Sequence, residues 1–146
     1  MSNLETVQSI YEAFGRGDVP TILDQLADYV MWEQWDDNTA QNAGYVLLTE
    51  RQGKAGAAAF FEAVMANAEV LDFEVRDFLA SDRQVVADVV IEVRLRSTGN
   101  VYRDEELHLW SFDGEGKVAR MRHYTDTAKH LEAAGLVEIP KDVVPA

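Results

Sequence analysis

The chain has 146 residues and a formal net charge of −13, from 26 acidic and 13 basic side chains. So acidic a surface repels phosphate backbones and anionic lipids, which argues against nucleic acids and membranes as partners. The absence of cysteine excludes disulfides, thiolate nucleophiles and thiolate metal sites. We expect a single domain over residues 1–146, with its core at about 4–135 and a tail at 136–146. With no secretory signal at 1–17 and no apolar run of roughly 18 residues, the expected location is the cytoplasm.

The N-terminal part predicts two helices and a strand. Ser2 and Glu5 have the spacing of a capping box, and apolar residues recur at helical intervals up to Gly15. Asp18 is placed to cap a second, short helix. Residues 29–35 are rich in aromatic and β-branched residues and predict a strand.

The next stretch has a weaker pattern. Residues 36–53 begin with polar residues and predict a loop, to which residues 45–49 add a short strand. Residues 54–68 predict a helix. Its apolar side is formed by Phe60, Phe61, Val64 and Met65. Core packing accounts for these side chains as well as a pocket wall does.

Extended segments dominate the second half. Alternating apolar residues at 71–79 and 85–95 predict two strands, and the break in period at 78–79 indicates a bulge. The turn sequences Ser-Thr-Gly-Asn and Asp-Gly-Glu-Gly then join two further strands. A last helix is expected at about 126–134, capped by Asp126. This order predicts an α+β fold, with helices on one face of an antiparallel sheet.

Polar side chains gather on one face of the last hairpin. Pairing outward from its turn places Glu106 opposite His123, and His108 opposite Met121. A slip of one residue would move the whole set to the other face. The complete face collects Ala87, Val89, Ile91, Asp104, Glu106, His108, Trp110, Met121 and His123.

This polar set supports three interpretations. Glu106 beside His123 predicts a general acid/base whose tautomer the carboxylate fixes, while His108 is placed to donate to a developing oxyanion. The same groups also fit a structural ion pair with a satisfied core histidine. A facial metal triad is disfavoured because strand geometry directs these side chains to different depths, so we expect no metal and no cofactor. His130, in the last helix, is expected to be solvated.

Four segments carry a family resemblance: YEAFGRGDVPTILDQLAD, YVMWEQW, GKAGAAAFFEAV and SFDGEGKVARMRHYTDTA. They resemble the SnoaL-like and ketosteroid-isomerase-like proteins of the nuclear-transport-factor-2-like superfamily, from Val7 to Leu131. The resemblance implies a cone-shaped, curved antiparallel sheet wrapped around three to four helices, with a single apolar pocket. It also implies a homodimer formed through the sheet. Family members include steroid isomerases, epoxide hydrolases, polyketide cyclases and non-catalytic binding proteins, so the fold alone does not choose a function.

The resemblance also implies roles for single residues. His123 stands where polyketide cyclases and limonene-type epoxide hydrolases have an acid/base aspartate, and His108 where ketosteroid isomerases have a protonated aspartate. Gln34 stands at the base aspartate of the isomerases, but an amide cannot abstract a proton. Trp32 replaces a tyrosine of the epoxide hydrolases, and Tyr11 lies one position from the oxyanion tyrosine of the isomerases.

Other positions depart from the family pattern, because Val89 and Ile91 replace the arginine and aspartate of the epoxide hydrolases. We therefore expect isomerase, cyclase or hydrolase chemistry of the acid/base type, with His123, Glu106 and His108 as catalytic residues. The substrate is expected to be small and mainly apolar, with a carbonyl or an acidic C–H. The alternative is a non-catalytic carrier or a homodimeric interaction module. Expected substrate contacts are Tyr11, Phe14, Trp32, Gln34, Phe60, Phe61, Met65, Val89, Ile91, Trp110 and Met121.

Overall fold

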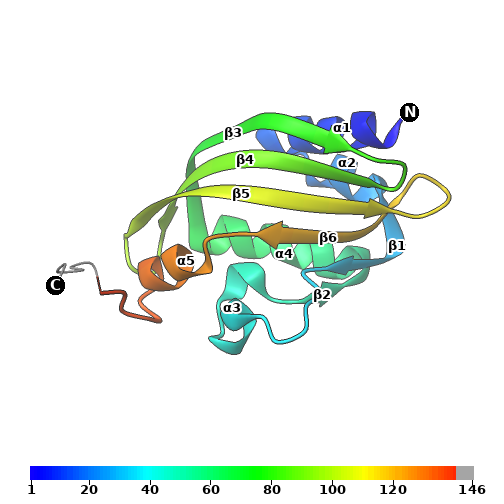
Figure 1. Cartoon of the computed structure of the whole chain (residues 1–146). Coiled ribbons are helices and arrows are strands. Elements are labelled where there is room, and N and C mark those ends of the chain that lie inside the picture. The colour runs from blue at the N-terminus through cyan, green and yellow to red at the C-terminus, as the bar shows by residue number, and fades with distance from the viewer. Residues whose placement is uncertain (141–146) are drawn as a thin grey trace, which may run out of the picture.

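The computed structural model describes residues 1–140, and these form one curved six-stranded sheet with five α-helices. The expected α+β class is confirmed, and α1, α2 and α4 lie on the inner side of the curve (Figure 1). Residues 141–146 of the predicted tail lie outside the described residues. The α-helices are α1 (Asn3–Gly15), α2 (Val19–Asp24), α3 (Thr39–Asn42), α4 (Gly53–Asn67) and α5 (Thr127–Ala133). The strands are β1 (Leu26–Trp32), β2 (Arg51–Gln52), β3 (Ala68–Ala80), β4 (Gln84–Leu95), β5 (Val101–Phe112) and β6 (Val118–Tyr124).

The predicted helix caps are present. The hydroxyl of Ser2 accepts from the backbone N–H of Glu5 at 3.1 Å, and the Glu5 carboxylate accepts from the Ser2 N–H at 3.2 Å. Asp18 caps α2 by accepting from the N–H of Thr21, and Asp126 caps α5 in the same way. Each cap satisfies N–H groups that the first turn of a helix leaves free, which fixes where these helices begin.

The sheet is mixed rather than purely antiparallel. Its strand order is β2-β1-β6-β5-β4-β3, and β1 runs parallel to β6 while the other neighbours are antiparallel. A parallel pair needs a long crossover between its two strands. Here the crossover includes α4 and the three long strands β3, β4 and β5. It brings β1, near the start of the chain, beside β6, the last strand (Figure 1).

The segment between β1 and α4 differs most from the prediction. The strand expected at 29–35 ends at Trp32, because Glu33 takes a positive φ of 58° that breaks the extended backbone. Residues 45–49 contain a 3-10 helix at Val46–Leu48 instead of a strand, and α3 precedes it. This segment contributes Leu48 to the core, where it is 5% exposed.

The pairing of β5 with β6 also differs, because the observed partner of His123 is His108 rather than Glu106. The turn shifts the pairing by one residue, which places Phe112 opposite Val118, and the bulge between Ser111 and Phe112 adds a second residue to the shift. A shift of two leaves every side chain on its predicted face, so the polar set still points inward. Glu106 lies opposite Val89 on β4.

Curvature comes from irregular pairing along β3. Its register against β4 shifts between Val70 and Asp72 and again between Val75 and Asp77, a few residues before the predicted bulge. Each bulge bends and twists the strand. The bend leaves room between the sheet and the helices for a pocket.

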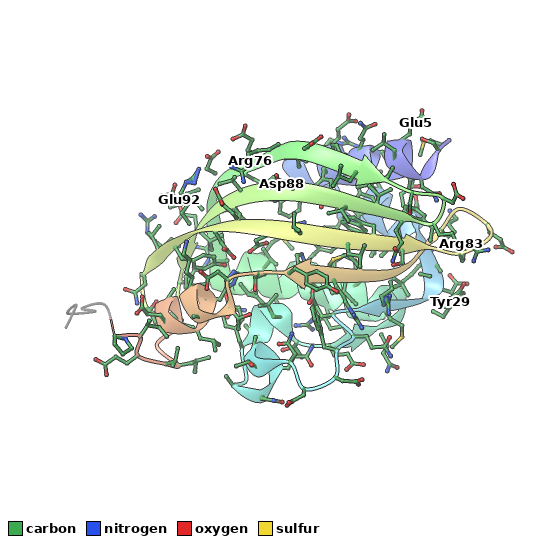
Figure 2. The ribbon with its side chains drawn as sticks, in the orientation of Figure 1. Glu5, Tyr29, Arg76, Arg83, Asp88 and Glu92 are labelled. Carbon is green, nitrogen blue, oxygen red and sulfur yellow. The ribbon has the colours of Figure 1, made fainter. Side chains whose placement is uncertain are left out.

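The outer face of the sheet is largely charged. The guanidinium of Arg76 on β3 bridges Asp88 on β4 at 3.3 Å and Glu105 on β5 at 3.2 Å, and Figure 2 shows Arg76 and Asp88 on neighbouring strands. These pairs are partly exposed, so each adds little to stability. Among the described residues, no helix has the length and apolar character that a membrane crossing requires.

Candidate active site

A cavity of about 100 Å³ lies between the inner face of the sheet and the helices α1 and α4. Its wall is mostly aromatic and aliphatic, which is typical of a small-molecule site. An apolar cavity of about 150 Å³ holds benzene, so this smaller cavity suits at most a compact ring. The wall includes eight of the predicted substrate contacts: Tyr11, Phe14, Trp32, Phe60, Phe61, Ile91, Trp110 and Met121.

Three other predicted contacts do not line the cavity. Gln34 is exposed, because the positive φ of Glu33 interrupts the alternation of the strand and turns Glu33 inward instead. Met65 is 61% exposed, since Val64 takes the position on the cavity side of α4. Val89 is fully buried but is not part of the cavity wall.

All three predicted catalytic residues line the cavity, but His123 has a partner that the sequence did not suggest. Its Nδ1 is hydrogen-bonded to Oε1 of Glu33, and its backbone N–H donates to the same oxygen at 2.9 Å. The second oxygen, Oε2, accepts from Nε1 of Trp35 at 3.2 Å. The carboxylate of Glu33 is therefore buried, fully occupied and directed at one ring nitrogen.

This pairing determines what His123 can do. Burial alone would lower the pKa of His123, but the charge and hydrogen bond of Glu33 outweigh it and raise the pKa. With Nδ1 held by Glu33, Nε2 is the nitrogen left for a ligand, and it has no hydrogen bond within residues 1–140. An imidazole oriented by a buried carboxylate is the arrangement of a general acid/base.

His108 lies next to His123, with 4.4 Å between the ring centroids, but both of its nitrogens are occupied. The indole of Trp110 donates to the hydroxyl of Tyr11 at 3.0 Å, and that hydroxyl bonds to Nδ1 of His108 at 2.7 Å. Because the indole can only donate, the Tyr11 proton is free to point at His108, which makes Nδ1 an acceptor. His108 is thus neutral, in agreement with the low pKa that burial and the nearby charge of His123 produce.

Glu106 joins two histidines. Its Oε1 accepts from Nε2 of His108 at 2.9 Å, and its Oε2 accepts from Nε2 of His130 at 3.0 Å. Burial would raise the pKa of Glu106, but these hydrogen bonds hold it well below its usual range. Glu106 is therefore a positioning group for His108 and His130 rather than the partner of His123.

The expectation that His130 is solvated is wrong, because it is only 4% exposed. Its Nε2 lies 2.7 Å from Oδ2 of Asp104 as well as 3.0 Å from Glu106. Burial acts to lower the pKa of His130, but the two carboxylates raise it to about 9. The imidazolium stays charged at neutral pH, which offsets the cost of burying these acids.

The oxygen and nitrogen atoms of Asp104, Glu106 and His130 lie within 4.8 Å of one another, so these residues could form a metal site. Metal-bound histidines almost always donate their other ring N–H to a second partner. Nδ1 of His130 has no such partner within residues 1–140. The donor set therefore fits an ion-paired imidazolium better than a metal.

The sequence reasoning missed Glu33 and His130 as members of the site. Glu33 follows Trp32 in a predicted strand, and alternation assigns it to the outer face. The one usable signal was an acidic residue directly after the apolar run of residues 29–32. For His130, the pattern Leu131 and Ala133–Ala134 on a short helix gave no clear face.

Comparison with known proteins agrees with this fold. The family model described as SnoaL-like domain matches residues 7–121, so the chain belongs to the SnoaL-like domain family. No curated protein matches the chain.

Solved structures with the same fold include three nearly full-length matches. An NTF2-like protein of unknown function from Burkholderia pseudomallei is 26% identical, with a TM-score of 0.75, covering 91% of this chain and 98% of that one. An NTF2-like protein from Burkholderia thailandensis is 18% identical, with a TM-score of 0.78 and coverages of 92% and 98%. TerC, co-crystallised with polyporic acid, is 24% identical, with a TM-score of 0.73 and coverages of 91% and 98%.

Proposed function

We propose that this chain is an enzyme that performs cofactor-independent acid/base chemistry on a small, mainly apolar molecule bound in the pocket. His123 takes a proton from an acidic C–H and returns it at another position, as in an isomerase or cyclase. The observation that carries the proposal is the buried carboxylate of Glu33 on Nδ1 of His123, which leaves Nε2 for the substrate. The co-crystal of TerC with polyporic acid supports a ligand site within this fold.

The acid/base chemistry follows from the pairing of His123 with Glu33. Neutral His123 accepts the proton at Nε2 and becomes an imidazolium whose charge Glu33 stabilises, as a buried carboxylate does in other acid/base dyads. The raised pKa of His123 makes it a stronger base than a free imidazole. Apolar walls exclude bulk water, which strengthens the interaction between the two charges.

A non-catalytic carrier of a small apolar ligand is the second candidate. The small cavity volume and the closed hydrogen-bond chain through Tyr11, His108 and Glu106 favour it, because they describe a rigid pocket with few free polar groups. A carrier does not require a side chain on the cavity wall that acts as a base, whereas the enzyme does.

Elimination of a nitrobenzisoxazole distinguishes the two, since this flat probe of two fused rings needs only a base in an apolar pocket. The expected rate rises with pH and reaches a plateau, with its midpoint above the ordinary histidine pKa of about 6.5, because neutral His123 is the base. Glu33→Gln is expected to move the midpoint to lower pH and to lower the plateau. A rate that follows hydroxide concentration without a plateau would favour the carrier.

We also infer a homodimer formed through the outer face of the sheet. Leu107 and Tyr124 are paired on neighbouring strands there and are 48% and 40% exposed. Sedimentation at micromolar concentration is expected to give the mass of a dimer, and Leu107→Glu is expected to give a monomer. Val46→Glu, which alters an exposed apolar residue away from the sheet, should leave the dimer intact. A monomeric wild-type chain would contradict the inference.

A further inference from the structure

Two nitrogen atoms in the pocket wall are buried without a hydrogen-bond partner among residues 1–140. They are Nδ1 of His130 and Nε1 of Trp32, and both residues line the cavity. A buried polar group without a partner is costly and rare in folded proteins. An indole N–H can only donate, so this atom lacks the acceptor that it requires.

His130 is a donor at Nδ1 as well. Its Nε2 lies between the carboxylates of Asp104 and Glu106, at 2.7 and 3.0 Å, so this nitrogen carries a proton. Two carboxylates on one ring favour the doubly protonated imidazolium, which places a second proton on Nδ1. The ring is held in place by Tyr102, whose centroid lies 4.4 Å away.

The charges around this donor limit the ligand. Glu106 lines the same cavity, its carboxylate stays ionised, and the whole chain has a net charge of −13. One imidazolium faces two acidic groups at this end of the pocket. A carboxylate ligand would add negative charge beside Glu106, whereas a neutral carbonyl oxygen accepts the hydrogen bond without that repulsion.

We propose that His130 is a substrate-binding residue whose Nδ1–H donates to the carbonyl oxygen of an uncharged substrate. The pocket then prefers neutral carbonyl compounds to carboxylates and to hydrocarbons of the same size. The inference rests on the proposed function in treating this pocket as the substrate site. When His123 takes the proton next to the carbonyl, the electron pair of the C–H bond moves toward the oxygen. The hydrogen bond from His130 strengthens as that oxygen gains charge.

Binding of three single-ring probes tests the proposal: acetophenone, benzoate and ethylbenzene, each titrated into the full chain and followed by NMR. Acetophenone is expected to bind at least tenfold more tightly than the other two. In His130→Gln, the amide nitrogen can still donate to Asp104 and Glu106, but no donor replaces Nδ1. This variant should bind acetophenone about 10- to 100-fold more weakly, which is the effect of losing one hydrogen bond from a charged group, and ethylbenzene unchanged.

The wild-type chain gives a second readout that does not depend on a variant folding. Acetophenone should shift the Nδ1–H resonance of His130 downfield, and ethylbenzene should leave it in place. Equal acetophenone affinity in wild type and His130→Gln, or benzoate binding as tight as acetophenone, would overturn the proposal.

These outcomes separate the inference from the proposed function. If His123 is not a base, the nitrobenzisoxazole rate shows no plateau, while the ketone preference still depends on His130. If His130 is not a donor to the ligand, wild type and His130→Gln bind acetophenone equally well, while the plateau remains.

Discussion

His123→Ala is expected to lower kcat/KM for nitrobenzisoxazole elimination by about 100- to 10,000-fold, the usual contribution of a positioned general base. The variant removes the imidazole whose Nε2 is left to accept a proton, whereas His130 is already protonated on both nitrogens. His108 cannot substitute, because Tyr11 and Glu106 occupy both of its nitrogens. The measurement is the pH–rate profile, in which the plateau should disappear.

The control for His123→Ala must separate chemistry from folding. The substitution leaves the Glu33 carboxylate buried without its ring partner, which costs stability. Circular dichroism and thermal melting will report that cost, and Arg120→Ala provides a matched change on the outer face of the same strand. Added imidazole should restore part of the activity by filling the space that the alanine leaves. Full activity in a folded His123→Ala chain would contradict the assignment of His123.

The free energy of unfolding is expected to fall by about 3 kcal/mol between pH 6.5 and pH 9, because folding raises the pKa of His130 from about 6.5 to about 9. A group whose pKa is higher in the folded state makes its full contribution to stability when the pH is below its pKa in the unfolded chain. That contribution is lost as the pH rises through the folded value. The raised pKa of His123 also lowers the free energy of unfolding as the pH rises. The lowered pKa of His108 affects the free energy of unfolding only below pH 6.5.

Urea unfolding at several pH values measures this slope. His130→Gln has no titrating group at this position, so its stability should change much less over the same range. The difference between the two chains isolates His130 from the surface groups that both share. Parallel curves for the wild type and His130→Gln would show that the ion cluster with Asp104 and Glu106 does not control stability.

Local sequence rules predicted much of the fold. The caps at Ser2, Asp18 and Asp126 were correct because each depends on one side chain and the adjacent backbone N–H groups. The inward face of β5 was also correct, since a two-residue error in register preserves the alternation of a strand. Each of these predictions depends on neighbours within a few residues along the chain.

The partners of the proposed catalytic groups could not be predicted in the same way. Glu33 and His123 are separated by 90 residues, and their contact depends on a parallel strand pair and a positive φ. The contact between His130 and Asp104 depends on where the last helix docks against β5. No periodic pattern encodes either event. Tertiary packing decides both.

The parallel pairing of β1 with β6 also affects how the site comes into being during folding. The two halves of the dyad come from distant parts of the chain, so closing the loop between them carries an entropic cost that no local contact repays. A nascent or partly unfolded chain can contain every helix and hairpin described above and still lack an oriented base. Catalytic competence would therefore emerge only in the last cooperative step, which makes turnover a sensitive reporter of complete folding.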